Sequence, residues 1–373
     1  MFGPGMSVQD QRRFNPRIES MRGVAALTVA AMHVTSSLVE GIPTRGSLDL
    51  VGLPLIKALS NGYGAVVAFF VISGFVLARS LDRNFSASRF LRGRVFRLFP
   101  AAIATIGLFA TLFYAFGFVV YRGASYAPLN ILANMAMLHA DIDRVMWSMK
   151  AELAATPLIF VCVWLYRRLG ARAVIAMGVV LFALAFVGQY SQFIGEDTNL
   201  ALLFAFPVGI LVHFKGEAIA RRLRPAAALL GTLGSVAVFC ACAFFKPSGT
   251  WTLLVQCLSA ATLVMLIAYR PDVPLLAVLD ARIVRFYGRI SYSFYLLHPL
   301  TFWATGQLTA WLLNGIDGLP ITVVAVTCVL SSVAAVTPLA YASWRFVELP
   351  AMNRRWSPRA IAVDAPLLVS GKV

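Results

Sequence analysis

The apolar residues of this chain form long, nearly continuous blocks instead of the short alternating pattern of a soluble core. Each block has roughly 17 to 25 residues, enough for a helix to cross the ~30 Å hydrocarbon layer of a bilayer. We therefore predict an all-α integral membrane protein with about ten transmembrane helices in one bundle. The predicted spans are 22–39, 63–81, 98–120, 147–166, 173–191, 199–214, 226–245, 251–269, 290–313 and 320–342. The apolar stretch 128–140 is short, so we expect it to be re-entrant or interfacial.

Composition and charge support this interpretation. Of 373 residues, 60% are hydrophobic and 13% charged, whereas a soluble domain has about 25% charged residues. If the N-terminus is cytoplasmic, the predicted inner segments collect most of the Lys and Arg residues, as is usual in membrane proteins. The six on predicted outer segments are Arg45, Lys57, Arg122, Arg144, Lys150 and Lys246. The net charge of +16 is thus explained by topology in a lipid bilayer, without a nucleic-acid partner, and both termini are expected in the cytoplasm.

The chain is expected to form one membrane domain. Residues 17–350 make up this domain, with cytoplasmic tails over 1–16 and 351–373. The N-terminal residues lack the leading apolar run of a signal peptide. The five cysteines lie inside apolar blocks without metal-binding spacing, so we expect no metal site.

Histidine and arginine on the first predicted span are the first candidates for chemistry. His33 follows Arg22 by eleven residues, which at 100° per residue puts both within ~20° on one helix face and ~16 Å apart along it. An anionic donor held by Arg22 could then reach the imidazole, and histidine is a suitable base near neutral pH. A histidine that only packs between helices is the alternative.

A basic cluster precedes the third span. It contains Arg89, Arg92, Arg94 and Arg97, and helical spacing points Arg94 and Arg97 the same way. Guanidinium groups bind phosphates well, so the cluster is a candidate cradle for coenzyme A. The alternative is that it sets topology or contacts anionic headgroups.

An acidic residue at the outer end of the fourth span is predicted at the depth of His33. Glu152 follows Trp147, which is expected in the interfacial aromatic belt. The carboxylate could orient the imidazole or bind acceptor hydroxyls. A structural pairing with Lys150 or Arg144 is the alternative.

Two further polar positions lie in apolar surroundings. His298 precedes Pro299 in the ninth span, and because proline frees a carbonyl one turn back, some local polar group has to satisfy it. His298 either is the polar group that satisfies this carbonyl or forms a second polar side of the active site. Ser73 lies in the run from Phe69 to Phe75. Together with Gly74, it is expected to allow close packing of helices or to line a substrate surface.

The motifs of other enzyme classes are missing. The sequence contains no Gly-x-Ser-x-Gly elbow, Walker loop, dinucleotide fingerprint or His-Glu-x-x-His pair. A transporter or flippase of lipids or glycans remains an alternative, although no internal repeat symmetry supports it.

Taken together, these elements resemble membrane acyltransferase family 3. Arg22-x10-His33 resembles the family's Arg/Lys-x10-His element, and Arg94-x-x-Arg97 its Arg-x-x-Arg element. Three further matches are Phe69 to Phe75, Trp147-Ser148 to Glu152, and Ser291-Tyr292 to His298-Pro299. The segment from Arg345 to Pro350 resembles the family's C-terminal end, whereas Met21, Met149 and Lys150 depart from its usual residues.

The resemblance implies a multi-pass enzyme of the bacterial inner membrane that transfers an acyl group, often acetyl, from acyl-CoA to a carbohydrate hydroxyl. Such O-acetylation belongs to polysaccharide biosynthesis, and the enzyme is a transferase of non-aminoacyl acyl groups. Carried over, His33 is the catalytic histidine, and Arg22, Arg94 and Arg97 are donor-side residues. From their positions in the sequence we also predict that Glu152 is catalytic and that Arg17 is on the donor side. Trp147, His298 and Ser73 are predicted on the acceptor side.

Overall fold

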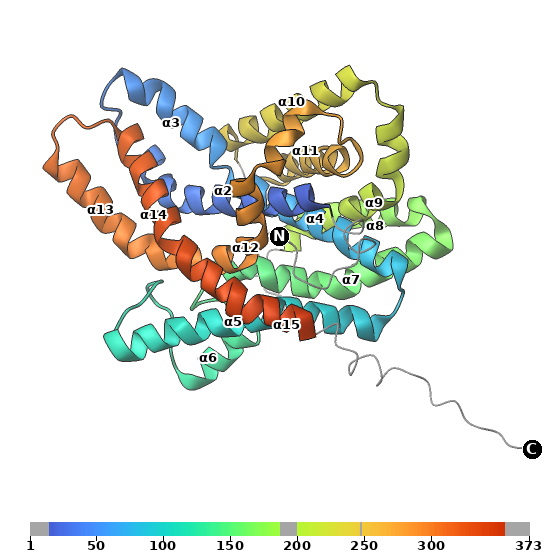
Figure 1. The fold of residues 1–373 in the computed structure, drawn as a ribbon, viewed down its shortest axis with the longest axis horizontal. Helices are drawn as coiled ribbons and strands as arrows, with labels where there is room; N and C mark the ends of the chain where they lie inside the picture. The colour runs from blue at the N-terminus through green and yellow to red at the C-terminus, as the bar shows by residue number, and fades with distance from the viewer. Residues whose placement is uncertain (1–14, 187–199, 247, 355–373) are drawn as a thin grey trace, which may run out of the picture.

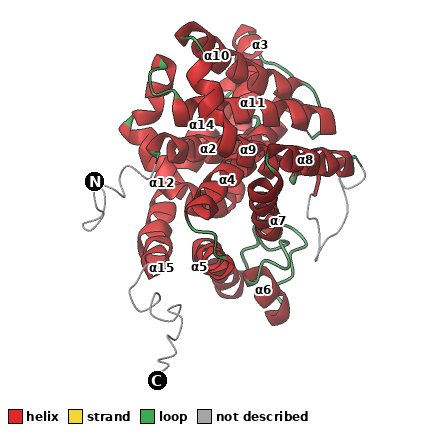
Figure 2. Cartoon of the chain, turned by 90° about the vertical axis from the view of Figure 1, so that its right-hand side faces the viewer, coloured by secondary structure: helices red, strands yellow, loops and turns green. Residues whose placement is uncertain are grey.

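The computed structural model describes residues 15–186, 200–246 and 248–354. This part of the chain is helical without strands (Figures 1 and 2). The longer helices are α2 (Pro16–Gly41), α3 (Ser47–Leu59), α4 (Gly62–Arg83), α5 (Ala87–Phe116), α6 (Pro128–Met135), α7 (Trp147–Leu169), α8 (Ala171–Ala185), α9 (Ala205–Arg222), α10 (Pro225–Ala241), α11 (Thr250–Tyr269), α12 (Arg282–Leu297), α13 (Phe302–Gly315), α14 (Ile321–Ser343) and α15 (Leu349–Arg354). Short turns of helix join them: η1 (Arg144–Met146), η2 (Leu200–Leu202), η3 (Cys242–Phe244), η4 (Pro274–Asp280), η5 (His298–Thr301) and η6 (Trp344–Glu348).

Several of these helices match a membrane in length and composition. Within the described residues, six helical segments are long and apolar enough to cross one. They are Ser47–Arg83, Ala87–Phe116, Arg144–Leu169, Pro225–Phe244, Thr250–Tyr269 and Ile321–Asn353. The predicted all-helical membrane fold is therefore confirmed in outline, while the count of about ten spans stays a prediction.

Some predicted elements differ in detail. The predicted span 290–313 is two helices, α12 and α13, because the chain turns through η5 where Pro299 lacks an amide hydrogen. The apolar stretch 128–140 contains only the eight-residue α6. Helix α3 was not predicted. Helix α8 ends at Ala185, and the remainder of the predicted span 173–191 extends into residues outside the described ranges.

Helix α2 lies at the centre of the bundle and packs against α12, α4 and α14 (Figure 1). Glycines allow its closest crossing. A Cβ atom on Gly288 of α12 would lie 2.7 Å from the backbone oxygen of Glu19, and one on Gly23 would collide with the backbone of Gly288. Helices α4 and α9 approach equally closely through Gly74 and Gly209. The predicted packing role of Gly74 is thereby confirmed.

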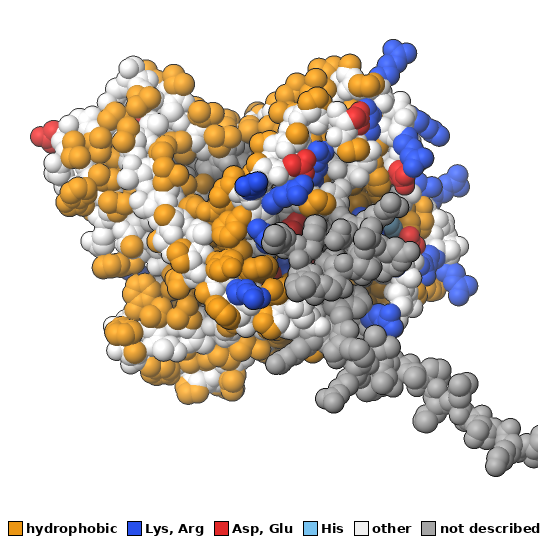
Figure 3. Space-filling model, in the orientation of Figure 1, with side chains coloured by type: hydrophobic (Ala, Val, Ile, Leu, Met, Phe, Trp, Pro, Cys, Tyr) orange, Lys and Arg blue, Asp and Glu red, His pale blue; other side chains and the backbone are white. Residues whose placement is uncertain are grey.

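The charged ends of several helices meet at one end of the molecule. Arg167, near the end of α7, donates hydrogen bonds to the backbone oxygens of Leu81 and Asp82, near the end of α4. In Figure 3 the Lys and Arg side chains gather on the right-hand half of the face shown, and the left-hand half is largely apolar or uncharged. This asymmetry is what a positive-inside topology requires.

Candidate active site

The two candidate histidines are neighbours in space. The ring centroids of His33, on α2, and His298, at the start of η5, lie 5.4 Å apart, and that of Phe302 lies 5.5 Å from His33. His298 is 1% exposed. His33 is accessible to solvent by surface area although protein atoms surround it densely. The ring of His33 is therefore accessible on one side and packed against protein on the other.

Pro299 determines the state of the second imidazole. In a continuous helix the carbonyl of Tyr295 would accept a hydrogen bond from the backbone N–H of residue 299, which proline lacks. Nδ1 of His298 lies 2.7 Å from that carbonyl oxygen. A carbonyl can only accept, so Nδ1 carries the proton and Nε2 is left with a lone pair. The prediction that a local polar group satisfies the freed carbonyl is therefore confirmed, and it is His298.

The free nitrogen of His298 is buried. Nε2 has no hydrogen-bond partner among the residues that the structure describes. A buried polar atom without a partner costs about 1–3 kcal/mol. The neutral imidazole thus presents an unused hydrogen-bond acceptor beside His33.

Glu152 pairs with an arginine. Its Oε1 lies 2.8 Å from Nη2 of Arg94, and it accepts a hydrogen bond of 2.8 Å from the hydroxyl of Ser73. Both charged side chains are nearly buried, at 6% and 9% exposure. Nε of Arg94 has no acceptor within the described part of the chain. A carboxylate held in this way neutralises Arg94, and no contact between Glu152 and His33 is present among the described residues.

A second buried pair lies beside the first. Arg97 forms an ion pair with Glu348 of η6, whose other oxygen accepts a hydrogen bond of 2.9 Å from the hydroxyl of Ser293. The guanidinium group of Arg97 also lies 5.5 Å from the ring centroid of Tyr292. Our sequence-based site did not include Glu348. Its acidic side chain in the segment from Trp344 to Pro350 is the sequence feature that could have indicated it, because ionisable residues in apolar surroundings usually have a function.

Arg22 joins these pairs electrostatically. It interacts with Glu19, Glu152 and Glu348, and with the like charge of Arg97. Counting Arg94 and Arg289, which interacts with Glu19, four arginines and three carboxylates therefore form one polar network through α2, α5, α7, α12 and η6. Such a network is nearly neutral, which reduces the cost of holding charges in a low-dielectric interior.

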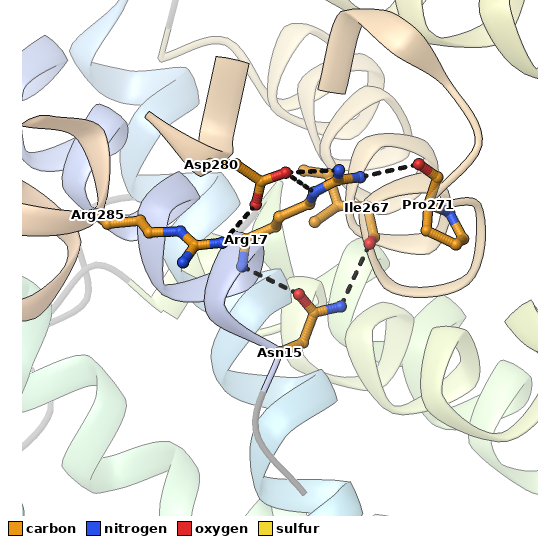
Figure 4. A network of polar contacts seen from close by, with 6 residues as sticks. All are labelled: Asn15, Arg17, Ile267, Pro271, Asp280 and Arg285. Carbon is orange, nitrogen blue, oxygen red and sulfur yellow. Dashed lines mark hydrogen bonds and ion pairs between the residues drawn. The ribbon is translucent and has the colours of Figure 1, made fainter. Parts of the chain in front are cut away.

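Arg17 is engaged outside this network (Figure 4). Nη2 and Nε lie 2.6 Å and 3.0 Å from Oδ2 of Asp280, and Nη1 donates to the backbone oxygen of Pro271. Arg285 contacts the second oxygen of Asp280 at 2.8 Å. Hydrogen bonds from Arg17, which has the largest effect, and from Arg285 hold the pKa of Asp280 below its usual range. The contacts fasten the start of α2 to η4.

The outer-side candidates are close to the histidines. The hydroxyl of Ser148 lies 2.8 Å from that of Tyr295, whose ring centroid is 5.7 Å from that of His298. Trp147 packs edge-on against Phe70 at 6.5 Å and is partly exposed. The start of α7 therefore lies against the end of α12.

A comparison with protein families identifies the domain that carries these residues. The model of the acyltransferase domain family matches residues 15–340. This chain belongs to membrane acyltransferase family 3. The match extends from α2 to α14 and so includes both histidines and Arg22, Arg94 and Glu152. No curated protein and no solved structure matches the chain significantly. This member of the acyltransferase family therefore carries its two histidines and its first buried ion pair within the family domain.

Proposed function

We propose that this protein is an integral membrane O-acyltransferase that moves an acyl group, expected to be acetyl, from acyl-CoA to a hydroxyl of a carbohydrate or glycosylated acceptor. The observation that carries the proposal is the accessible ring of His33 next to the free Nε2 of His298. An imidazole within reach of a bound hydroxyl group suits general base catalysis.

The proposed reaction proceeds in two proton-coupled steps. His33 removes the proton of the acceptor hydroxyl while the hydroxyl oxygen attacks the thioester carbonyl carbon. This attack gives a tetrahedral intermediate. The carbon–sulfur bond then breaks, and the imidazolium of His33 gives this proton to the departing thiolate of coenzyme A. The products are the O-acyl ester and free coenzyme A. His298 would hold the acceptor by accepting a hydrogen bond from a second hydroxyl at Nε2.

The donor is proposed to enter along the arginines of the polar network. Arg22 lies on the same helix as His33, three turns closer to the charged end of the bundle. Nε of Arg94 is available to a phosphate or thioester oxygen, since no described residue accepts from it. Arg97 and Arg17 would contribute to the same entrance. Glu152 would keep the guanidinium of Arg94 in place.

The acceptor is proposed to approach from the opposite end, where Ser148, Tyr295 and Trp147 lie beside the histidines. A bacterial inner membrane would then separate cytoplasmic donor from extracytoplasmic acceptor. In this arrangement Trp147 offers a partly exposed apolar surface on which a sugar ring can stack.

The test is a transfer assay on the purified full-length chain. In detergent, wild-type protein with acetyl-CoA and an acceptor should release free thiol, and His33→Ala should reduce the rate about 100- to 10,000-fold while thermal unfolding stays unchanged. A folded His33→Ala protein that retains the wild-type rate would reject the role of the base. The acceptor would be identified by mass spectrometry of surface glycans with and without the protein, as a mass difference of one acyl unit.

The same assay separates an enzyme from a transporter or flippase. Transport has no meaning in detergent, where there are no two compartments, whereas acyl transfer continues. A protein that moves glycans across vesicles but consumes no thioester in detergent would support the alternative.

A further inference from the structure

A buried carboxyl group outside the predicted site lacks a well-formed hydrogen bond among the described residues. Asp143 precedes η1 and is fully buried, at 0% exposure. Neither of its carboxylate oxygens makes a well-formed hydrogen bond within the described residues, although the backbone N–H of Val145 lies where it favours the charged form. Burial raises the pKa of Asp143 well above its usual range. Such a group destabilises the unliganded protein.

Asp143 is close to the histidine pair. Its charge acts on the phenol groups of Tyr121 and Tyr295. The ring centroid of Tyr295 is 5.7 Å from that of His298, and the Tyr295 hydroxyl contacts the backbone oxygen of Val145 at 3.2 Å. Asp143 therefore belongs to the segment, two residues before Val145, that packs against Tyr295 beside His298.

Tyr121 connects the same carboxylate to His33 from the other side. Its ring centroid lies 6.0 Å from that of Phe302, which in turn is 5.5 Å from that of His33. The Tyr121 hydroxyl is buried and has no partner in the described ranges, while the guanidinium of Arg144 lies 5.3 Å from the ring centroid. Tyr121 is partly exposed as a residue.

Within the described residues, four unpartnered polar atoms belong to residues in and next to this part of the bundle. They are both oxygens of Asp143, the hydroxyl of Tyr121 and Nε2 of His298. Each buried unpartnered group is unfavourable, and most native ones bind water, an ion or a ligand. The set contains a hydroxyl that can donate and three atoms that can accept, which matches a ligand carrying several hydroxyl groups.

We infer that Asp143, with Tyr121 beside it, is an acceptor-binding element that recognises vicinal hydroxyl groups of a sugar. The inference rests on the proposed function, since it assigns a further part of the acceptor site. Two hydroxyls would donate to the carboxylate, and the Tyr121 hydroxyl would donate to a ring or hydroxyl oxygen. Asp143 is therefore assigned to substrate recognition and takes no part in proton transfer.

The experiment compares two variants with a matched control. Asp143→Asn and Asp143→Leu remove the carboxyl group, and Asp317→Asn makes the Asp-to-Asn change on an exposed residue in the loop after α13. Methyl α-glucoside, α-galactoside and α-mannoside serve as acceptors, with acetyl-CoA as donor. We expect the KM for the best glycoside to rise roughly 10- to 100-fold in both Asp143 variants. The KM for acetyl-CoA should stay unchanged, and Asp317→Asn should behave as wild type.

Thermal unfolding without sugar distinguishes recognition from a structural role. Because the buried carboxyl oxygens of Asp143 make no well-formed hydrogen bond among the described residues, both variants should unfold at the wild-type temperature or above it. A lower unfolding temperature together with a raised KM for acetyl-CoA would assign Asp143 to the fold and overturn the inference. Unchanged KM for the glycosides in both variants would also overturn it.

Binding of the same glycosides, measured by saturation-transfer NMR, separates this inference from the proposed function. If the wild type transfers no acyl group to any acceptor, the proposed function fails. The assignment of Asp143 is then judged by binding alone. Glycoside binding that is lost in Asp143→Asn supports it, and equal binding or no binding by the wild type overturns it.

Discussion

The imidazole rings of His33 and His298 lie 5.4 Å apart, and the second ring is held by the carbonyl of Tyr295. This relationship gives each histidine a separate chemical capacity. Nδ1 of His298 is committed as a donor, so its Nε2 can only accept, whereas His33 is the ring proposed to take the proton of the acceptor hydroxyl. Two nearby imidazoles also disfavour double protonation, because like charges repel.

The two roles of His298 can be separated by a pair of substitutions. His298→Ala should lower stability by about 1–3 kcal/mol, because the Tyr295 carbonyl loses its donor. Adding Pro299→Ala restores a backbone N–H for that carbonyl, so the double variant should recover most of the unfolding temperature. Its acyl-transfer rate should remain at least about tenfold below wild type, since Nε2 is still absent. Recovery of activity along with stability would show that His298 serves the helix alone.

Paired substitutions can likewise separate the contribution of the Arg94–Glu152 pair to stability from its role in donor binding. Removing either partner alone leaves a buried charge, which should cost roughly 3–5 kcal/mol. The double change Arg94→Met with Glu152→Leu fills the space without charge and should restore the unfolding temperature. Binding of coenzyme A, measured by calorimetry, should nevertheless stay weakened. Wild-type affinity in the double variant would contradict a donor-binding role of Arg94.

The crossing of α4 and α9 should be sensitive to a single methyl group. A Cβ atom on Gly209 would collide with the backbone oxygen of Val71, which cannot move away without shifting its helix. We expect Gly209→Ala to destabilise the protein by about 1–3 kcal/mol or more. Gly234→Ala in α10 is the control, because a Cβ atom there meets nothing within 4 Å. Thermal unfolding in detergent measures both, and equal unfolding temperatures would disagree with the close packing.

The fastening of α2 to η4 should weaken in acid. Hydrogen bonds from Arg17 and Arg285 lower the pKa of Asp280, so its contribution to stability is present above the unfolded pKa of about 3.9. It is lost as the pH falls through the lower, folded pKa. Asp280 is 35% exposed, so we expect Asp280→Asn to cost under about 1 kcal/mol.

The measurement is the unfolding-temperature difference between wild type and Asp280→Asn. It should be constant from about pH 8 to about pH 5, shrink as the pH falls below the unfolded pKa of about 3.9, and disappear once the pH is below the lowered folded pKa, where the wild-type carboxyl group is also protonated. Asp317→Asn provides the control with an exposed carboxylate. A difference that grows in acid would have the wrong sign for this ion pair.

The sequence alone determined those features that depend on local chemistry. Apolar blocks of membrane length predicted the helices, and the spacing of Arg22 and His33 placed them on one face of α2. Pro299 predicted a freed carbonyl and named His298 as a candidate to satisfy it. The family motifs predicted the family, which the match over residues 15–340 confirmed.

The tertiary structure determined which polar side chains pair with one another. From depth in the membrane, Glu152 was expected near His33, but rotation of α7 about its axis turns the carboxylate toward Arg94 and Ser73. Glu348 and Asp143 join the polar groups of the bundle from distant parts of the chain, and no local periodicity predicts such contacts. Hydrophobic patterns specify how far a helix extends, whereas the contacts of its polar groups depend on the rotation and crossing of neighbouring helices, which packing across the whole bundle sets.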